Sequence, residues 1–266
     1  MPAEPVIQIT GPWTHRSVTA NGSRFHVASM GEGPLVLLLH GFPEFWWTWR
    51  HQLVTLAEAG YRAVAVDLRG YGSSDKPPRG YDLVTAAADA AGLVRALGEA
   101  NATVVGHDWG GLAAWTLAAY FPKAVRRLAV VSMAHPLRMR ARVLSSPFTI
   151  SRSLNEPDGQ VKRGGYPLAF QVPMIPERRL VRDGGALVES ILSSWSAPGW
   201  PDKETAQTYQ RAMRIPPQIA RGAGRYVEGP YRWKVIEGAG HFPHEERPEL
   251  FDAELLGWLA DPEPDR

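Results

Sequence analysis

The stretch VVGHDWGG, residues Val104–Gly111, contains one carboxylate between glycines. It lies where an apolar segment typical of a strand ends and a segment with helical spacing begins. Its pattern is G-x-D-x-G, and Asp108 takes the central position that serine usually holds in a strand–turn–helix of this kind. Such a turn holds its central side chain out into a cleft, and N–H groups at the helix start point to the same place. Aspartate is also a favoured residue for capping a helix. The stretch alone therefore leaves a structural and a catalytic role open.

Strands and helices alternate on both sides of this turn. The expected strands are Leu35–Leu39, Ala63–Val66, Thr103–Val105, Leu128–Val131 and Arg232–Ile236, after a hairpin of His15–Ala20 and Arg24–Ser29 around Asn21-Gly22. The expected helices are Trp49–Ala59, Leu83–Ala100, Leu112–Tyr120 and Glu249–Leu259. This order predicts an α/β fold with a mostly parallel sheet flanked by helices. Ligands of such sheets bind at the carboxyl ends of the strands, where HGFP, DLRGYG, HDW and SMAHP all fall.

The composition of the sequence changes after Pro136. Residues 137–216 lose the apolar strands and keep modest helical stretches at Gly185–Trp195 and Lys203–Met213. We interpret residues 1–136 as the first part of the core and 137–216 as an incomplete helical cap, or lid, over the strand ends. Residues 217–266 then return to the core and carry a histidine to the cleft.

Composition limits the classes of function. A net charge of +2 over 266 residues, with scattered arginines, gives no electrostatic argument for nucleic acid. The chain has no cysteine, which excludes disulfides and thiolate metal sites. No signal peptide and no membrane span is expected from the apolar runs, so the expected localisation is cytoplasmic. We expect no cofactor and no metal, since no His and carboxylate cluster has metal-ligand spacing.

A nucleophilic aspartate would need a base and an oxyanion site. His241, in Gly238–His241 after the last expected strand, is the expected base. The backbone N–H groups of Phe42 and Trp109 are the expected oxyanion hole. His40 and Pro43 line the expected pocket, with His40 holding its loop by hydrogen bonds.

The remaining histidines are interpreted as supporting residues. His107 and His135 would serve packing or loop support near the cleft. His244, beside two glutamates, would lie at the surface.

Four motifs in order resemble one family across nearly the whole chain. HGFPEFWWTWR (40–50), DLRGYGSSDKP (67–77), GHDWGG (106–111) and GAGHFPHEE (238–246) are similar to those of the soluble, cap-bearing epoxide hydrolases of the α/β-hydrolase fold. The resemblance implies that Asp108 opens an epoxide to an alkyl ester and that His241 activates the water that hydrolyses this ester to a diol. It also implies a role in detoxification.

A cap tyrosine donates to the epoxide oxygen in this family, and Tyr166 in YPLAFQ matches it, although Tyr166 also suits an ordinary aromatic of the cap core. The Phe170-Gln171 pair that follows would join the substrate pocket. The expected partner is a small hydrophobic epoxide. A homodimer is left open by the sequence.

Two alternatives remain open. Haloalkane and haloacetate dehalogenases resemble this sequence and share the ester chemistry, but Phe42 and Trp109 stand where many of them carry Asn and Arg. The other alternative is an inactive, ligand-binding protein that keeps the pocket and has lost turnover.

That second alternative is motivated by a gap in the pattern. The family's acid behind the histidine and its second cap tyrosine have no match here, and the anomaly localises to RIPPQIARG, residues 214–222. Asp202, Glu204 and Glu228 follow no strand, and Tyr209, Tyr226 and Tyr231 are misplaced. Either the chain lacks a strand, the acid and a tyrosine, or the sequence joins two stretches that are separate in the family. We favour the second explanation, which predicts a Cα–Cα separation well beyond ~3.8 Å within 215–218.

Overall fold

A six-stranded sheet forms the centre of the protein. The computed structural model describes residues 8–135, 182–213 and 232–262. The strands lie in the order β1-β2-β4-β3-β5-β6, and their bounds are β1 Thr14–Ala20, β2 Ser23–Met30, β3 Leu35–Leu39, β4 Arg62–Val66, β5 Ala102–His107 and β6 Val125–Val131. β3 pairs in parallel with β4 and β5, and β5 with β6, whereas β2 runs antiparallel to β1 and β4. The predicted α/β class and mostly parallel sheet are confirmed.

The first two strands form the predicted hairpin. Asn21 and Gly22 both have positive φ, at 45° and 72°, as a two-residue turn between twisted antiparallel strands requires. β1 and β2 pair from Thr14 opposite Ser29 to Ala20 opposite Ser23.

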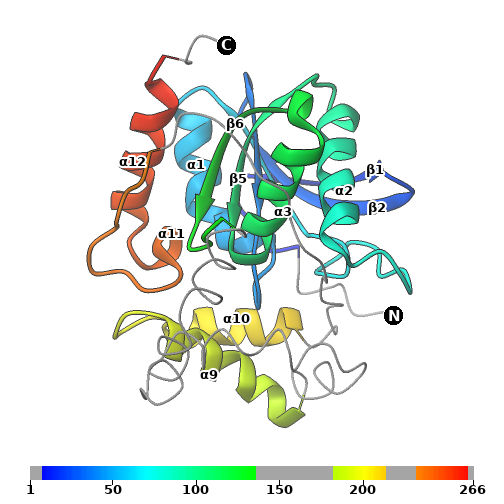
Figure 1. Ribbon diagram of the computed structural model, residues 1–266. Helices are drawn as coiled ribbons and strands as arrows, with labels where there is room; N and C mark the ends of the chain where they lie inside the picture. The colour runs from blue at the N-terminus through cyan, green and yellow to red at the C-terminus, as the bar shows by residue number, and fades with distance from the viewer. Residues whose placement is uncertain (1–7, 136–181, 214–231, 263–266) are drawn as a thin grey trace, which may run out of the picture.

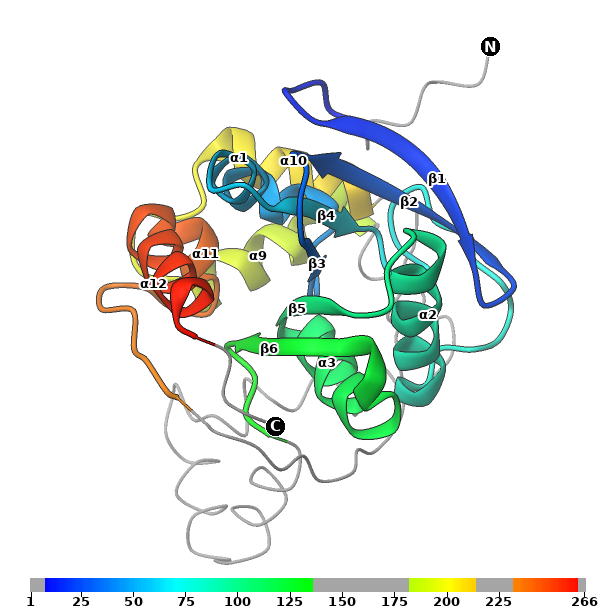
Figure 2. The ribbon, with the colours of Figure 1, turned by 90° about the horizontal axis from the view of Figure 1, so that it is seen from above.

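Helices cover the sheet on both faces, because alternate residues of the strands point to opposite sides. In β3, Val36 and Leu38 belong to a core cluster shared with α1 and α12, while Leu35, Leu37 and Leu39 face the cluster under α2 and α3. Figure 2 shows α2 and α3 on one side of the sheet and α1 and α12 on the other. The bounds are α1 Arg50–Glu58, preceded by the 3₁₀ helix Trp46–Trp49, α2 Leu83–Ala96, α3 Asp108–Tyr120 and α12 Pro248–Ala260.

A pair of helices lies below the carboxyl ends of the parallel strands (Figure 1). α9 spans Ala186–Trp195, α10 spans Lys203–Met213, and both match the helical stretches predicted between the two parts of the core. Tyr209 of α10 packs on Phe45 and Trp47, with ring centroids 5.7 Å apart in both contacts. A 3₁₀ helix, Arg182–Gly185, precedes α9, and the short α11 spans Pro243–Glu246.

The expected strand Arg232–Ile236 is wrong. These residues have no regular secondary structure, and the side chains of Trp233 and Val235 are 72% and 52% exposed. A strand requires a neighbour to take its backbone hydrogen bonds, and no described strand pairs with this segment. The residues just before it, including the predicted break within 215–218, lie outside the described ranges.

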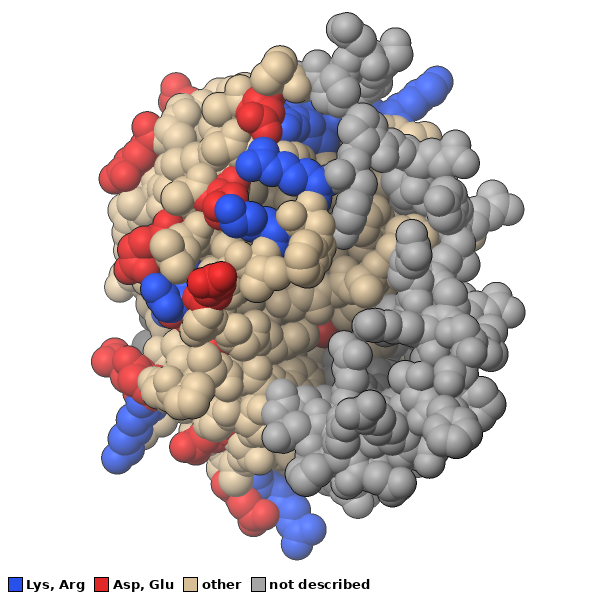
Figure 3. All heavy atoms as spheres, turned by 60° about the vertical axis from the view of Figure 1, so that its left-hand side comes forward, with Lys and Arg blue, Asp and Glu red and all other residues tan. Residues whose placement is uncertain are grey.

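The surface is consistent with the small net charge. On the face seen in Figure 3, Lys and Arg side chains are interspersed with Asp and Glu. Within the described part of the chain, no helix is both long and apolar enough to cross a membrane.

Candidate active site

Asp108 occupies a tight turn between β5 and α3. β5 ends at His107, α3 begins at Asp108, and Asp108 has φ of +48°, a conformation that L-residues seldom adopt. The side chain is 3% exposed. A strained turn at the carboxyl end of a central strand holds a side chain in one direction, so Asp108 is fixed rather than mobile.

The glycines around this turn are required by close backbone approach. A Cβ on Gly110 would lie 2.2 Å from the carbonyl oxygen of Leu39, and one on Gly106 would lie 2.4 Å from that of Gly110. A Cβ on Gly41 would lie 2.5 Å from the Cβ of Asp108. The β3 and β5 loops therefore meet at distances that only glycine permits.

The Asp108 carboxylate lies between a backbone donor and an imidazole. The N–H of Phe42 donates to Oδ1 at 3.1 Å, and Nε2 of His241 lies 3.4 Å from Oδ2. Burial acts to raise the pKa of Asp108, but His241, His107 and the Phe42 N–H outweigh it and hold this pKa below the ordinary value. The group is thus an anion at neutral pH. Trp109 follows it in the first turn of α3, whose N–H groups point toward this end of the helix.

His241 reaches Asp108 from a loop that leads into α11. Its backbone N–H donates to the carbonyl oxygen of Trp195 at 2.9 Å, and its ring meets that of Trp195 edge to face at 5.2 Å. The side chain of His241 is 22% exposed. Among the described residues, Asp108 is the one carboxylate within 4.0 Å of its ring nitrogens.

His107 links the loop of His241 to Glu44 through hydrogen bonds. Its Nδ1 hydrogen-bonds Glu44 Oε2 at 2.7 Å, and its Nε2 bonds the carbonyl oxygen of His241 at 2.8 Å. Burial acts to lower the pKa of His107, but the Glu44 carboxylate outweighs it and raises this pKa. Burial acts to raise the pKa of Glu44, but His107 and His244 outweigh it and hold this pKa well below its ordinary value.

His244 is buried, so the expected surface position is wrong. α11 turns it inward, where its ring stacks on Trp49 at 4.4 Å and its Nε2 lies 2.7 Å from Thr48 Oγ1. Thr48 in turn donates to Glu44 Oε1 at 2.6 Å. The acidic neighbours that suggested exposure are themselves engaged, Glu245 with Arg50 at 2.5 Å and Glu246 with backbone N–H groups.

Sequence reasoning missed this Glu44 network. Ligand atoms of Glu44, His107 and His244 lie within 4.8 Å of one another, as in a metal site. The 2.7 Å between Glu44 Oε2 and His107 Nδ1 is a hydrogen-bond length, whereas two ligands about 2.0–2.1 Å from one zinc ion would be separated by more than about 3 Å. The donor set fits a hydrogen-bonded network better than a metal. The signal available in the sequence was one acid, Glu44, inside the aromatic run PEFWWTW.

His40 and Pro43 are buried beside the turn. Both ring nitrogens of His40 are used, Nδ1 on the Gly41 carbonyl oxygen at 2.8 Å and Nε2 on the Leu68 N–H at 3.1 Å. Burial lowers the pKa of His40. His40 therefore orders its loop as a neutral ring. His135, the other supporting histidine, packs on Trp115 with ring centroids 4.9 Å apart.

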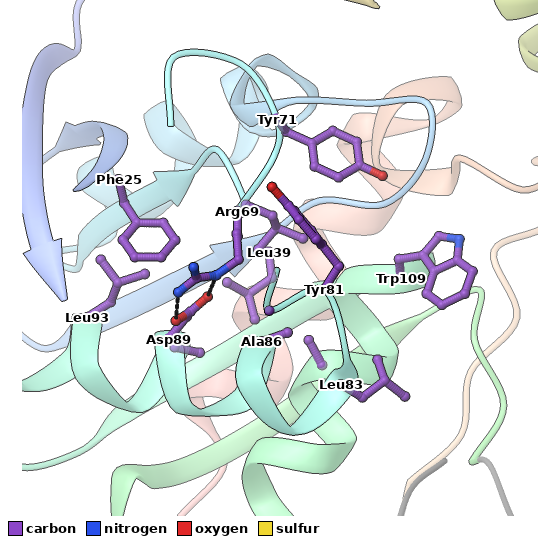
Figure 4. Close-up of a pocket in the computed structure, with 14 residues that line it drawn as sticks. Phe25, Leu39, Arg69, Tyr71, Tyr81, Leu83, Ala86, Asp89, Leu93 and Trp109 are labelled. Carbon is purple, nitrogen blue, oxygen red and sulfur yellow. Dashed lines mark hydrogen bonds and ion pairs between the residues drawn. The ribbon is translucent and has the colours of Figure 1, made fainter. Parts of the chain in front are cut away.

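An apolar pocket adjoins the turn on the α2 side. Figure 4 shows Leu39, Tyr71, Leu83 and Trp109 around it and the Arg69–Asp89 ion pair on its wall. Asp108 does not line this pocket, so the pocket lies beside the carboxylate rather than over it.

Several predicted residues do not join this cluster. Tyr166, Phe170 and Gln171 lie outside the described residues. Tyr209 is buried and donates its hydroxyl to Glu245 Oε1 at 2.6 Å, which leaves it no proton for a ligand. Of the candidate acids, Asp202 caps α10 by accepting the Thr205 N–H at 2.7 Å. Glu204 is exposed in the first turn of α10, and Glu228, like Tyr226 and Tyr231, falls among residues that the structure does not describe.

Known sequences similar to this chain fall in one family. Residues 36–254 match the model of the Alpha/beta hydrolase family. Epoxide hydrolase 3 of Xenopus tropicalis is 42% identical over 290 residues, covering 91% of this chain and 76% of that protein. AB hydrolase superfamily protein YfhM of Bacillus subtilis is 36% identical over 203 residues, 75% of this chain and 67% of its own length. The chain spans only 42% of another relative, epoxide hydrolase 4 of Mus musculus, at 40% identity over 161 residues and 59% of this chain.

Solved structures lead to the same group. Epoxide hydrolase A from Mycobacterium thermoresistibile superposes with a TM-score of 0.75 at 25% identity, covering 93% of this chain and 98% of that one. Epoxide hydrolase VrEH1 from Vigna radiata gives a TM-score of 0.69 at 26% identity with the same coverage.

The alignment with the Xenopus protein runs over more residues than the 266 of this chain, so that relative has residues with no counterpart here.

Proposed function

The chain belongs to the alpha/beta hydrolase family, among its epoxide hydrolases, and we propose that it converts an epoxide to a vicinal diol through an ester on Asp108. The single observation that carries the proposal is the pairing at Asp108. One carboxylate oxygen accepts the Phe42 N–H at 3.1 Å, and the other lies 3.4 Å from His241 Nε2. An aspartate held as an anion between an oxyanion donor and an imidazole suits nucleophilic attack followed by general-base hydrolysis.

The first step forms the ester. Asp108 Oδ2 attacks a ring carbon of the epoxide, the carbon–oxygen bond of the ring breaks, and the ring oxygen takes a proton from the phenol of Tyr166. Oδ1 stays on the Phe42 N–H. A neutral phenol suits this role, because its pKa near 10 keeps the proton available at neutral pH.

The second step regenerates the enzyme. His241 takes a proton from water, the resulting hydroxide attacks the ester carbonyl carbon, and the oxyanion on Oδ1 is stabilised by the N–H groups of Phe42 and Trp109. The tetrahedral intermediate collapses to the Asp108 carboxylate and the diol. The proton on His241 returns to the Tyr166 phenolate.

The same proposal assigns the parts of the chain. Residues 1–136 and 217–266 form the core, and 137–216 form the cap, with α9 and α10 across the strand ends (Figure 1). His40, Pro43, Phe170 and Gln171 line the substrate pocket. The substrate is a small hydrophobic epoxide, and the enzyme acts in the cytoplasm, with a homodimer as the assembly to be tested.

A single turnover in heavy-oxygen water tests the mechanism. With enzyme in excess over an aryl epoxide, the label is expected in the Asp108 carboxylate and not in the diol, because water attacks the ester carbonyl. Mass spectrometry of the peptide carrying Asp108 reads this out. Label in the diol alone would overturn the ester mechanism, and the absence of both ester and diol would favour the ligand-binding alternative. Halide release from a haloalkane, tested in parallel, would favour the dehalogenases.

A further inference from the structure

Glu246, at the end of α11, directs its whole carboxylate at the backbone of the His241 loop. Oε2 accepts the Gly240 N–H at 2.8 Å, and Oε1 accepts the Phe242 N–H, on the other side of the histidine, at 2.9 Å. The two donors are the residues immediately before and after His241. Three residues of backbone are thereby held by one side chain.

The same carboxylate also reaches the helix pair over the strand ends. The N–H of Ala197, two residues beyond the end of α9, donates to Glu246 Oε2 at 2.7 Å. Trp195 in that segment accepts the His241 N–H at 2.9 Å, and a Cβ on Gly240 would lie 2.6 Å from the Trp195 carbonyl oxygen. Glu246 therefore joins the end of α9 to the loop at its tightest contact.

The loop depends on such a bond because it has little backbone pairing of its own. Residues 232–241 contain no described helix or strand. A carboxylate that accepts backbone N–H groups forms charge-assisted hydrogen bonds, about twice as strong as neutral ones. Misplacing a reacting group by about 1 Å can cost about a hundredfold in rate.

We propose that Glu246 is a positioning residue for ester hydrolysis, which holds His241 at the distance from Asp108 that water activation needs. The inference rests on the proposed function of Asp108 and His241. Glu246 touches no reacting atom and acts through the backbone of Gly240 and Phe242. The formation of the ester needs Asp108 but not His241, so a displaced His241 slows the second step and leaves the first unchanged.

The test is Glu246→Gln, which keeps the length of the side chain. An amide has one acceptor oxygen and presents its NH₂ to the other backbone N–H, so one side of the bridge is lost. In single-turnover mixing with an aryl epoxide, we expect ester formation at the unaltered rate and hydrolysis slowed about 10- to 100-fold. In the steady state kcat and KM fall together, because kcat/KM reports the steps up to the ester.

Glu249→Gln is the matched control, because Glu249 is exposed in the first turn of α12 and its side chain makes no hydrogen bond to another described residue. It is expected to leave both steps unchanged. Hydrolysis at the unaltered rate in Glu246→Gln overturns the inference, and so does an equal loss of both steps with a lowered thermal midpoint, which marks a structural role. If the Gln variant does not fold, Glu246→Asp, which keeps the charge with a shorter reach, carries the same test. Absence of ester in the unaltered enzyme would instead overturn the proposed function.

Discussion

The two sides of the proposed site, the nucleophile side at Asp108 and the base side at His241, are held by different kinds of contact. Asp108 follows β5, which is hydrogen-bonded to β3 on one edge and to β6 on the other, and its turn is fixed by glycines in backbone contact. His241 lies on a loop that is held by hydrogen bonds to side chains, directly to Glu246 and through His107 to Glu44. Backbone hydrogen bonds to both neighbouring strands make the Asp108 side rigid. The other half relies on a few charged hydrogen bonds, so the two halves are expected to fail in different ways.

The largest effect is expected for His241→Gln. Removing a general base costs about 10²- to 10⁴-fold in rate, and the ester on Asp108 should accumulate because its formation does not need the imidazole. Mass spectrometry of the intact protein after incubation with an aryl epoxide measures it. Asp108→Asn is the paired control, with no ester. An ester that fails to accumulate in His241→Gln would mean that the two sides do not act in separate steps.

Gly110→Ala tests the backbone contacts of the nucleophile side. The new Cβ would lie 2.2 Å and 2.5 Å from two carbonyl oxygens, those of Leu39 and His40, which cannot move without opening β3. We expect a loss of about 3 kcal/mol in the free energy of unfolding, measured by urea titration.

Gly257→Ala in α12 is the matched control for Gly110→Ala. A Cβ on Gly257 meets nothing within 4 Å, and alanine in a helix interior gains about 0.5–1 kcal/mol over glycine. Equal effects of the two substitutions would contradict the view that backbone contact fixes the nucleophile.

Glu44→Gln tests the network under the base side, with a pH dependence. The pKa of Glu44 is lowered in the folded protein, so its contribution to stability is present above its ordinary value of 4.5 and is lost as pH falls through the lowered value. The pKa of His107 is raised, so its contribution is present below 6.5 and is lost as pH rises through the raised value. The variant should be less stable by about 2 kcal/mol, most of all between about pH 5 and 6.

Urea unfolding of both proteins checks this prediction about the Glu44–His107 pair. It is measured at about pH 5.5, inside the window, and at about pH 4 and about pH 8, on either side of it. A difference in unfolding free energy that stays constant over the three pH values would show that the pair does not titrate as an ion pair.

The smallest effect is expected for Asp82→Ala, because the Asp82 carboxylate bonds Thr85 at the surface and not Asp108 or His241. Asp82 caps α2 by accepting the Thr85 N–H at 2.9 Å on the surface. Its loss should cost about 1 kcal/mol of unfolding free energy and leave kcat unchanged, as measured by denaturation and steady-state kinetics. A change in kcat would mean that the start of α2 is coupled to the position of Asp108.

Local pattern predicted most of the fold. LVLLL predicted β3 with its observed bounds, because an unbroken apolar run of this length suits a buried strand. Asn21-Gly22 predicted the hairpin, because both residues readily adopt the positive φ that the turn requires. α2 ends at Ala96 rather than at residue 100, since Gly98 adopts φ of +90°. Arg232–Ile236 was the failure, because a strand is defined by its neighbour and not by its own sequence.

The site divides in the same way. GHDWGG by itself determined that a carboxylate would stand at a strand–helix turn, because glycines at those spacings admit few backbones. Only the tertiary structure decided what surrounds it: that Glu44 and His107 form a buried pair, that His244 turns inward onto Trp49, and that Glu246 bonds Ala197 beyond α9. The Glu44–His107 bond joins residues 63 positions apart, and the bond of His244 to Thr48 joins residues 196 positions apart. A sequence pattern specifies the backbone close to it, whereas a hydrogen bond between distant residues exists only after the sheet has brought them together.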